Sequence, residues 1–469
     1  MVRPPTFARR RHTSGFSSAP GEPKQSPMAV FPIEDETAVL SPPTRSVVRW
    51  DGWKFAVFAA AMTMVASAFL SFWLPMILGV HEWFMSGDAW LTVNSAQWVS
   101  HGAIGTVYEA NPWYSALPGF LVLLAPVVAL ADHLGMVTSY PVPLPYPSMW
   151  LIVGPFFFLC GGIAVLGVDY LMNALSIDTG RRRTALILIG FLLIAPTPGF
   201  AGHPEDVLTI ALVCFCIASA TRQNWMRAML ILSAAVMVQT WAGLLIPALV
   251  AASPAGLRLR NLVRASLLPG ACAALLLILD FKPASTDLLK QPMANRGQEL
   301  PWWHMAGHML VNDGSAIVSV AIGSSSRWLA VLTAALLGLV ILRHPSPTNL
   351  VAVGALALLA RGFFETEIWF YYLAPASTLF VVFVAASTRG NAKRWIVGTV
   401  FALLMTIAWP GATFSISISP MVAELVLLTC GAGALAAAFL PDSRSVTDST
   451  APEVGRHQGG DALSYARSI

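Results

Sequence analysis

The stretch AAMTMVASAFLSFWL, residues 60–74, decides the fold class. It is a solid apolar block without a charged side chain, and its apolar and polar residues do not alternate. Alternation over about ten residues is typical of the strands of a membrane β-barrel, whereas an unbroken apolar block is typical of a helix that crosses a bilayer. The sequence therefore predicts an all-α fold.

The composition of the whole chain supports this prediction. Of the 469 residues, 56% are hydrophobic and 11% are charged, and the mean hydropathy is +0.66. A soluble domain carries about 25% charged residues. These values exclude a soluble globular enzyme, a nucleic-acid-binding protein and a disordered chain. We expect a polytopic bundle of transmembrane helices, with membrane lipids and no nucleic acid among its partners.

Apolar runs divide the chain into about 11–13 expected spans. The region Met226–Ala252 is either one long helix or two short ones that meet near Gln239, and hydropathy does not decide between them. The runs cover about 55–80, 116–132, 149–175, 184–199, 206–220, 226–240, 241–254, 265–281, 327–342, 349–364, 368–387, 395–410 and 420–440.

Three regions follow from these runs. Residues 1–50 and 441–469 are rich in small and polar residues and lack a periodic apolar pattern, so we predict disordered tails, the first of them cytoplasmic. Residues 51–440 form the transmembrane domain. The first run is too long and too far from Met1 to be a cleaved signal peptide.

The basic clusters set the expected orientation. Lys and Arg gather on cytoplasmic loops, and from Arg181 onward successive clusters are separated by two runs each. Three runs lie between the N-terminal tail and Arg181. If all three cross the membrane, this odd number places the tail and the Arg181 cluster on opposite sides. Either the run at 116–132, broken by Pro126, is re-entrant, or one cluster lies on the other side.

Two long segments are expected on the outer side, at 81–115 and 282–326. The first is dense in Trp and Tyr, which membrane interfaces favour. Within it, Ala89–His101 can form an interfacial helix with Trp90, Val93, Ala96 and Gln97 on one side.

Several kinds of site lack a sequence signal. The five cysteines lie in apolar runs without metal-ligand spacing, and phosphate loops, a Gly-x-Ser-x-Gly elbow and His-Glu-x-x-His are absent. We therefore expect no cofactor and no dependence on a metal. Asp169 and Glu424 stand alone in apolar runs, and we expect each to make a structural contact between helices.

Asp88 follows the first span in the segment Ser86-Gly87-Asp88-Ala89-Trp90. It is either the N-cap of the interfacial helix or a general base that takes a proton from a hydroxyl nucleophile at the membrane surface. Glu109 lies further along the same segment.

The segment Gly202-His203-Pro204-Glu205-Asp206 predicts a helix start, with Pro at the first position and acids in the first turn. It is either a well-capped helix or a binding site in which His203 and the helix end hold a phosphate or sugar hydroxyl. The two acids suit sugar hydroxyls or an ion pair with Arg361.

Arg361, Glu365, Tyr371 and Tyr372 lie between two late runs. Arg361 and Glu365 are four residues apart and either form a surface pair or leave Arg361 to bind a lipid-linked phosphate. Paired tyrosines are commonly interfacial anchors.

Taken together, these motifs resemble membrane glycosyltransferases of the GT-C fold, and more closely actinobacterial polyprenol-phosphate-mannose-dependent α-mannosyltransferases. The resemblance spans roughly residues 53–390. It rests on a first span followed by an outer Gly-Asp, on Tyr108 with Asn111-Pro112-Trp113-Tyr114, on Gly202–Glu205, on Gln239 and Trp241, and on Arg361, Glu365, Tyr371, Tyr372 and Pro375.

The resemblance implies an enzyme of cell-envelope biosynthesis in the bacterial plasma membrane. It would transfer a hexose or pentose, such as mannose, with inversion, from a polyprenyl-phosphate donor to a lipid or glycan acceptor on the outer face. Asp88 would be the general base, and the other motif residues would bind substrate. Relatives often have Lys-Gln where this chain has Val238-Gln239. The chain then relies on Arg361, uses another donor or has lost transfer activity.

Two other classes of function remain open. A transporter or flippase of a lipid-linked sugar would place its site near the bilayer midplane and show internal repeats. We find no such repeat. The other class is a catalytically inactive scaffold, in which Asp88 would be dispensable.

Overall fold

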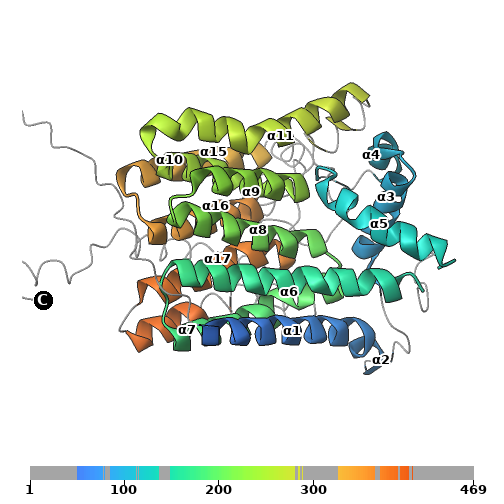
Figure 1. The fold of residues 1–469 in the computed structure, drawn as a ribbon, viewed down its shortest axis with the longest axis horizontal. Helices are drawn as coiled ribbons and strands as arrows, with labels where there is room; N and C mark the ends of the chain where they lie inside the picture. Colours follow the sequence, from blue (N-terminus) through green and yellow to red (C-terminus); the bar gives the residue numbers. More distant parts are fainter. Residues whose placement is uncertain are drawn as a thin grey trace, which may run out of the picture. The chain divides into compact units, whose positions relative to one another are not determined.

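The computed structural model describes residues 50–77, 85–111, 116–136, 148–279, 326–364, 370–388 and 391–400, with a few isolated positions. The chain divides into the units Met1–Ser41 and Pro42–Ile469, and every described residue belongs to the second. The described residues form α-helices and short 3₁₀ and π-helical turns, without a β-strand among them (Figure 1). The all-α prediction is confirmed. The expected tails 1–50 and 441–469 lie outside the described residues, apart from Trp50 at the start of the first helix.

Five helical segments are long and apolar enough to cross a membrane, which indicates a multi-pass membrane protein. They are Trp53–Phe72, Trp150–Ala174, Thr179–Ala201, Pro204–Thr221 and Ala255–Leu279. Six further apolar helices in the described part of the chain are shorter, at 10–17 residues.

Eleven of the thirteen predicted runs coincide with helical segments. The runs at 395–410 and 420–440 lie largely or wholly outside the described residues. The α-helices on the other runs are α1 (Trp50–Phe72), α5 (Gly119–His133), α6 (Trp150–Ala174), α7 (Thr179–Leu188), α8 (Pro204–Thr221), α9 (Trp225–Val238), α10 (Ile246–Ala252), α11 (Arg258–Leu279), α15 (Ser326–Arg343), α16 (Pro347–Phe364) and α17 (Phe370–Ser387).

The region Met226–Ala252 consists of two helical segments. Gln239 ends α9 with an extended backbone (φ −150°, ψ 119°), and the 3₁₀ segment η4 (Thr240–Leu245) leads into α10. An extended residue cannot continue an α-helix. The break therefore lies near Gln239, where the sequence predicted that two short helices would meet if the region was not one long helix.

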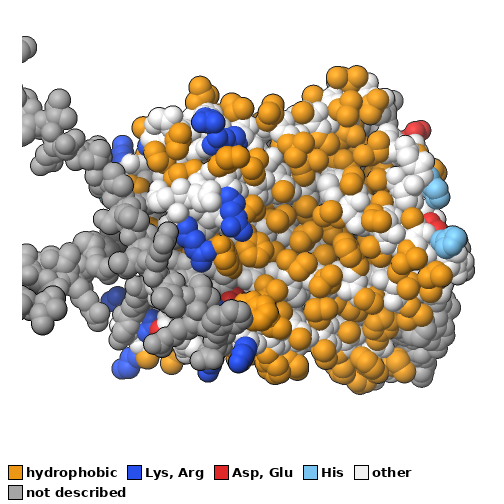
Figure 2. Space-filling model, viewed as in Figure 1, with side chains coloured by type: hydrophobic (Ala, Val, Ile, Leu, Met, Phe, Trp, Pro, Cys, Tyr) orange, Lys and Arg blue, Asp and Glu red, His pale blue; other side chains and the backbone are white. Residues whose placement is uncertain are grey.

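Charged side chains separate along the long helices. On the face shown in Figure 2, Lys and Arg gather at one end and His side chains lie at the other, with Asp and Glu at both ends. The basic residues come from α7, α9, α11, α15 and the turns beside them, so we call this the basic end. The opposite end, where α8 begins, is the His203 end. This pattern agrees with the expectation that successive basic clusters after Arg181 are separated by two helical segments.

Helix α5 explains the odd number of runs before Arg181. It packs mainly against α3 (Gly87–Ser100), and both lie at the His203 end (Figure 1). Helix α1 leads from the basic end to the His203 end, and α6 leads back (Figure 1). The run at 116–132 thus does not carry the chain between the two ends, so the basic clusters can share one end.

The expected outer segment 81–115 is largely helical where it is described. It contains α3, the 3₁₀ turn η1 (Ile104–Thr106) and α4 (Val107–Ala110). On α3 the buried side chains are Ala89, Thr92, Val93, Ser95 and Ala96. Val93 and Ala96 agree with the predicted face, whereas Trp90 and Gln97 are only partly buried. The segment 282–326 lies almost entirely outside the described residues.

Asp169 makes the contact between helices that the sequence predicted. Its two carboxylate oxygens accept hydrogen bonds from Nε and Nη2 of Arg182 at 2.5 Å each, which joins α6 to α7 near the basic end. The Asp169 side chain is 8% exposed. Breaking a buried ion pair is costly because the remaining charge loses its partner.

We expect Asp169→Asn to destabilise the protein by roughly 3 kcal/mol, because the Arg182 guanidinium then stays buried without a counter-charge. Thermal unfolding in detergent measures this loss. Asp178→Asn is the matched control. Asp178 caps α7 and pairs with Arg181, but its side chain is 59% exposed, and Asn caps equally well. Equal unfolding temperatures for the two variants would contradict a structural role for the buried pair.

Candidate functional site

The segment before α8 is built from π-helical turns. The turns η2 (Ile189–Ile194) and η3 (Thr197–Ala201) continue α7, and Gly202 then adopts a left-handed conformation at φ +79°. Pro204 follows at the first position of α8, with Glu205 and Asp206 in its first turn. The predicted helix start is confirmed. π-Helical turns are rare and frequently occur at functional sites.

Gly202 allows this segment to contact the start of α3. A Cβ at Gly202 would collide with the Ser86 hydroxyl and would lie 2.8 Å from the backbone nitrogen of Ala89. Ser86 Oγ donates a hydrogen bond to the Ala201 carbonyl at 2.9 Å and accepts one from the Ala89 amide at 3.1 Å. Ser86 is therefore the N-cap of α3, and the alternative that Asp88 is the cap is wrong. Asp88 lies in the first turn, with its carboxylate free for other contacts.

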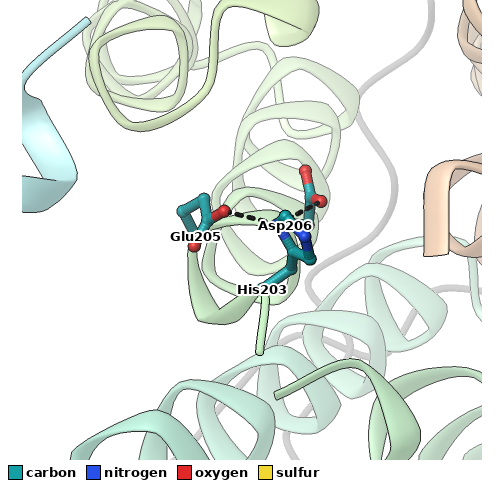
Figure 3. A group of neighbouring side chains, drawn as sticks. All are labelled: His203, Glu205 and Asp206. Atoms are coloured by element: carbon teal, nitrogen blue, oxygen red, sulfur yellow. Dashed lines mark hydrogen bonds and ion pairs between the residues drawn. The ribbon is translucent and has the colours of Figure 1, made fainter. Parts of the chain in front are cut away.

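His203 connects Asp88 with the first turn of α8. Its Nε2 lies 3.0 Å from Oδ2 of Asp88. Its Nδ1 lies 2.8 Å from Oε1 of Glu205, a contact drawn in Figure 3. The same Nδ1 lies 3.9 Å from Oδ2 of Asp206. An imidazolium donates from both ring nitrogens, so this geometry suits the protonated ring. The Asp88 side chain is 49% exposed, while those of Glu205 and Asp206 are 6% and 1% exposed.

The charges of this group change the pKa values of His203 and Asp88. Burial disfavours the His203 imidazolium, but the charge of Glu205 and the hydrogen bonds of Asp88 and Glu205 outweigh it and raise the pKa of His203 well above its ordinary value. Partial desolvation opposes ionisation of Asp88. The hydrogen bond and charge of His203 outweigh it and hold the pKa of Asp88 below its ordinary value. In the absence of a ligand, Asp88 is therefore a carboxylate paired with an imidazolium.

Aromatic rings of α17 cover the His203 ring. The rings of His203 and Tyr371 stack with centroids 3.9 Å apart and an interplanar angle of 23°. Tyr372 packs edge-on against Tyr371 at 4.8 Å. Since Tyr371 is only 4% exposed, it is not the interfacial anchor that paired tyrosines commonly form. The stack fixes the plane of the imidazole.

Asp206 connects α8 to η4 and α16. Its Oδ1 accepts a hydrogen bond from the indole Nε1 of Trp241 at 2.7 Å and lies 3.9 Å from Nη1 of Arg361. The Arg361 guanidinium lies over the rings of Tyr372 at 4.2 Å and Trp241 at 5.7 Å. The ion pair between Arg361 and an acid of this segment, one of the sequence alternatives, is present.

The structure brings together most of the predicted site residues. Tyr108 is buried, and its hydroxyl donates to the Ala116 carbonyl at 2.9 Å, while Glu109 is exposed on α4. Gln239 contributes the helix break, and Glu365 lies outside the described residues. The residues joined by the contacts above are Asp88, His203, Glu205, Asp206, Trp241, Arg361, Tyr371 and Tyr372. We call them the His203 cluster.

Sequence reasoning missed the role of Ser86. Serine is a favoured N-cap, and its place two residues before Asp88 was the available signal. The second hydrogen bond of Ser86, to the Ala201 carbonyl 115 residues away, has no local signal. The stacking of Tyr371 on His203 likewise depends on tertiary packing.

Comparison of the chain with protein-family models, with curated proteins and with solved structures found no match.

We expect Gly202→Ala to weaken the contact between α3 and the His203 segment. Its Cβ adds both strain at positive φ, about 1–2 kcal/mol, and a collision with Ser86. Gly102→Ala is the matched control, because Gly102 has φ +77° but open space around a Cβ. Thermal unfolding should therefore show a larger loss for Gly202→Ala. Equal losses would mean that the close approach to α3 contributes nothing to stability.

Proposed function

We propose that the protein is an integral membrane glycosyltransferase of GT-C type. It transfers one sugar from a polyprenyl-phosphate donor to a hydroxyl group of a lipid or glycan acceptor, with inversion at the anomeric carbon. The observation that carries the proposal is the half-exposed Asp88 carboxylate, which His203 holds in the first turn of α3, at the end of the helices opposite the basic residues. The resemblance in sequence motifs supports the same assignment.

Asp88 is suited to act as the general base. Its lowered pKa keeps it ionised at neutral pH, and the His203 bond orients one oxygen while the other remains able to accept a proton. In the proposed step, the acceptor oxygen forms a bond to the anomeric carbon as its proton passes to Asp88. The bond between that carbon and the phosphate oxygen breaks, and polyprenyl phosphate leaves with the electron pair.

Arg361 is suited to stabilise the leaving phosphate. Its guanidinium is fixed by Asp206 and by two aromatic faces, and a pre-oriented cation stabilises charge that develops on a leaving group. Arginine can also bind phosphate oxygens in a bidentate manner. The chain has no lysine beside Gln239. In this assignment, Arg361 of α16 supplies the cation of the cluster instead.

The position of the cluster favours an enzyme over a transporter. Transporter sites lie near the bilayer midplane, between paired broken helices. The His203 cluster instead lies where α8 begins and α16 ends, at one end of the long helices. In a bacterial plasma membrane with the basic end inside, this end would face outward.

We expect Asp88→Asn to reduce sugar transfer by a factor of about 10²–10⁴, because Asn cannot accept the hydroxyl proton. Purified protein in nanodiscs is assayed with labelled polyprenyl-phosphate mannose and a lipid acceptor extract. Since Ser86 caps α3, the thermal stability should stay near that of the wild type.

Asp132→Asn is the control for this variant. Asp132 lies on α5 at the same end, and both of its oxygens accept from Gln97 Nε2, at 3.2 and 3.1 Å. Transfer by this control should be unchanged. If Asp88→Asn transfers sugar at the wild-type rate, Asp88 is not the base. If the wild type itself transfers no sugar from any of several polyprenyl-phosphate donors, the proposed function is contradicted.

We expect Arg361→Lys to raise the KM for the donor at least about tenfold, because lysine keeps the charge but loses the planar fork. Kinetics with varied donor concentration measure this change. Arg227→Lys, at the basic end, is the control. An unchanged KM in Arg361→Lys would exclude bidentate donor binding by Arg361.

A further inference from the structure

The first turn of α8 gathers three side chains that can ligate a metal ion. His203, Glu205 and Asp206 each offer one ligand atom, and these atoms lie within 4.8 Å of one another (Figure 3). Bonds from a divalent transition cation to nitrogen and oxygen are roughly 2.0–2.2 Å long, so ligand atoms of one ion lie about 3–4.4 Å apart. The 3.9 Å between His203 Nδ1 and Asp206 Oδ2 already falls in this range.

Two buried carboxylate oxygens at this place lack a hydrogen bond. Within the described part of the chain, Glu205 Oε2 and Asp206 Oδ2 have no donor within hydrogen-bond distance. Asp206 Oδ2 is directed toward the His203 ring, at a distance too long for a hydrogen bond. A buried carboxylate oxygen without a partner is costly, and a bound cation satisfies it.

The groups around these ligands orient them as the outer shell of a metal site does. Metal-bound histidines usually donate their second ring nitrogen to a carboxylate, which fixes the tautomer. Asp88 is positioned to accept from His203 Nε2, so the nitrogen that ligates is Nδ1, which exchanges its 2.8 Å contact with Glu205 Oε1 for the ion. Asp206 Oδ1 is held by Trp241 and Arg361, which leaves Oδ2 for a metal.

The charges of the group leave room for a divalent ion. Asp88, Glu205 and Asp206 carry three negative charges when ionised, and Arg361 supplies one positive charge. A proton on His203 leaves one negative charge unbalanced, whereas a divalent ion on neutral His203 leaves none. The positive end of the α8 dipole opposes a cation, but the formal charges of three carboxylates outweigh this partial charge.

From these observations we propose that His203, Glu205 and Asp206 bind one divalent transition cation, such as Mn²⁺ or Zn²⁺. An imidazole nitrogen with two carboxylate oxygens suits these ions better than Mg²⁺ or Ca²⁺, which prefer oxygen ligands alone. The ion displaces the proton from Nδ1 of His203. The half-exposed Asp88 and the partly exposed His203 ring mark the side from which it enters.

This site differs from the expectation from sequence, which contained no metal. Its ligands are confined to His203-Pro204-Glu205-Asp206, and their convergence depends on the turn at Gly202 rather than on a spacing typical of zinc or calcium sites. The proposal stands independently of the proposed transferase, since it concerns binding of the metal alone.

Direct binding of Mn²⁺ tests the site. Full-length protein in nanodiscs is treated with EDTA, and MnCl₂ is added while free Mn²⁺ is measured by electron paramagnetic resonance. We expect saturable binding of one ion per chain. Glu205→Gln and Asp206→Asn should each weaken it at least about tenfold, and Asp88→Asn by about 10–100-fold through the orientation of His203. Asp132→Asn is the control and should bind as the wild type does.

A second measurement on the wild type avoids any dependence on the folding of variants. Echo modulation of bound Mn²⁺ should show coupling to an imidazole nitrogen, and ZnCl₂ should displace the ion. Absence of saturable binding, absence of the nitrogen coupling, or unchanged affinity in both carboxylate variants would each overturn the proposal. None of these Mn²⁺-binding measurements requires sugar transfer. A wild-type protein that binds Mn²⁺ but transfers no sugar would therefore contradict the proposed function and leave the metal site intact.

Discussion

The two hydrogen bonds of the His203 ring join parts of the chain that are 115 residues apart. On one side is Asp88 of α3, which is half-exposed, and on the other is Glu205 of α8, which is buried. An ionised carboxylate at a buried position is costly without a compensating charge, which the imidazolium, or a cation in its place, supplies to Glu205. Tyr371 of α17 stacks on this ring, while Arg361 of α16 and Trp241 of η4 contact the neighbouring Asp206.

The long helices and the cluster have separate physical roles. Helices α6 and α8 pack against each other more extensively than any other pair described, and the buried pair of Asp169 and Arg182 lies far along them from His203. This packing fixes the position of the first turn of α8. The polar contacts at the His203 end then need only to orient side chains on a rigid support, which is the arrangement that a reaction centre requires.

Local patterns in the sequence predicted the helices and the helix start well, because apolar runs and the Pro-Glu-Asp turn act over neighbouring residues. They also predicted the inter-helix contact of Asp169 and the ion pair of Arg361 with an acid. They did not predict the stacking of Tyr371 on His203 or the choice of Ser86 as the cap, since both depend on segments that meet only in the folded chain. Helix α5 was ambiguous for a related reason: its length and hydropathy resemble those of a span, but its packing against α3 keeps it at one end.

The π-helical turns before Gly202 determine the direction in which the chain continues to His203 and α8. A π-helical turn holds more residues than an α-helical turn, so two such turns in succession set the rotation at which the chain leaves Ala201. Removal of a single residue between Ile189 and Ala201 would turn the exit point by about 100°. His203 would then face lipid or packed side chains instead of Asp88. The length of this segment, more than the identity of its apolar residues, therefore determines which way His203 faces.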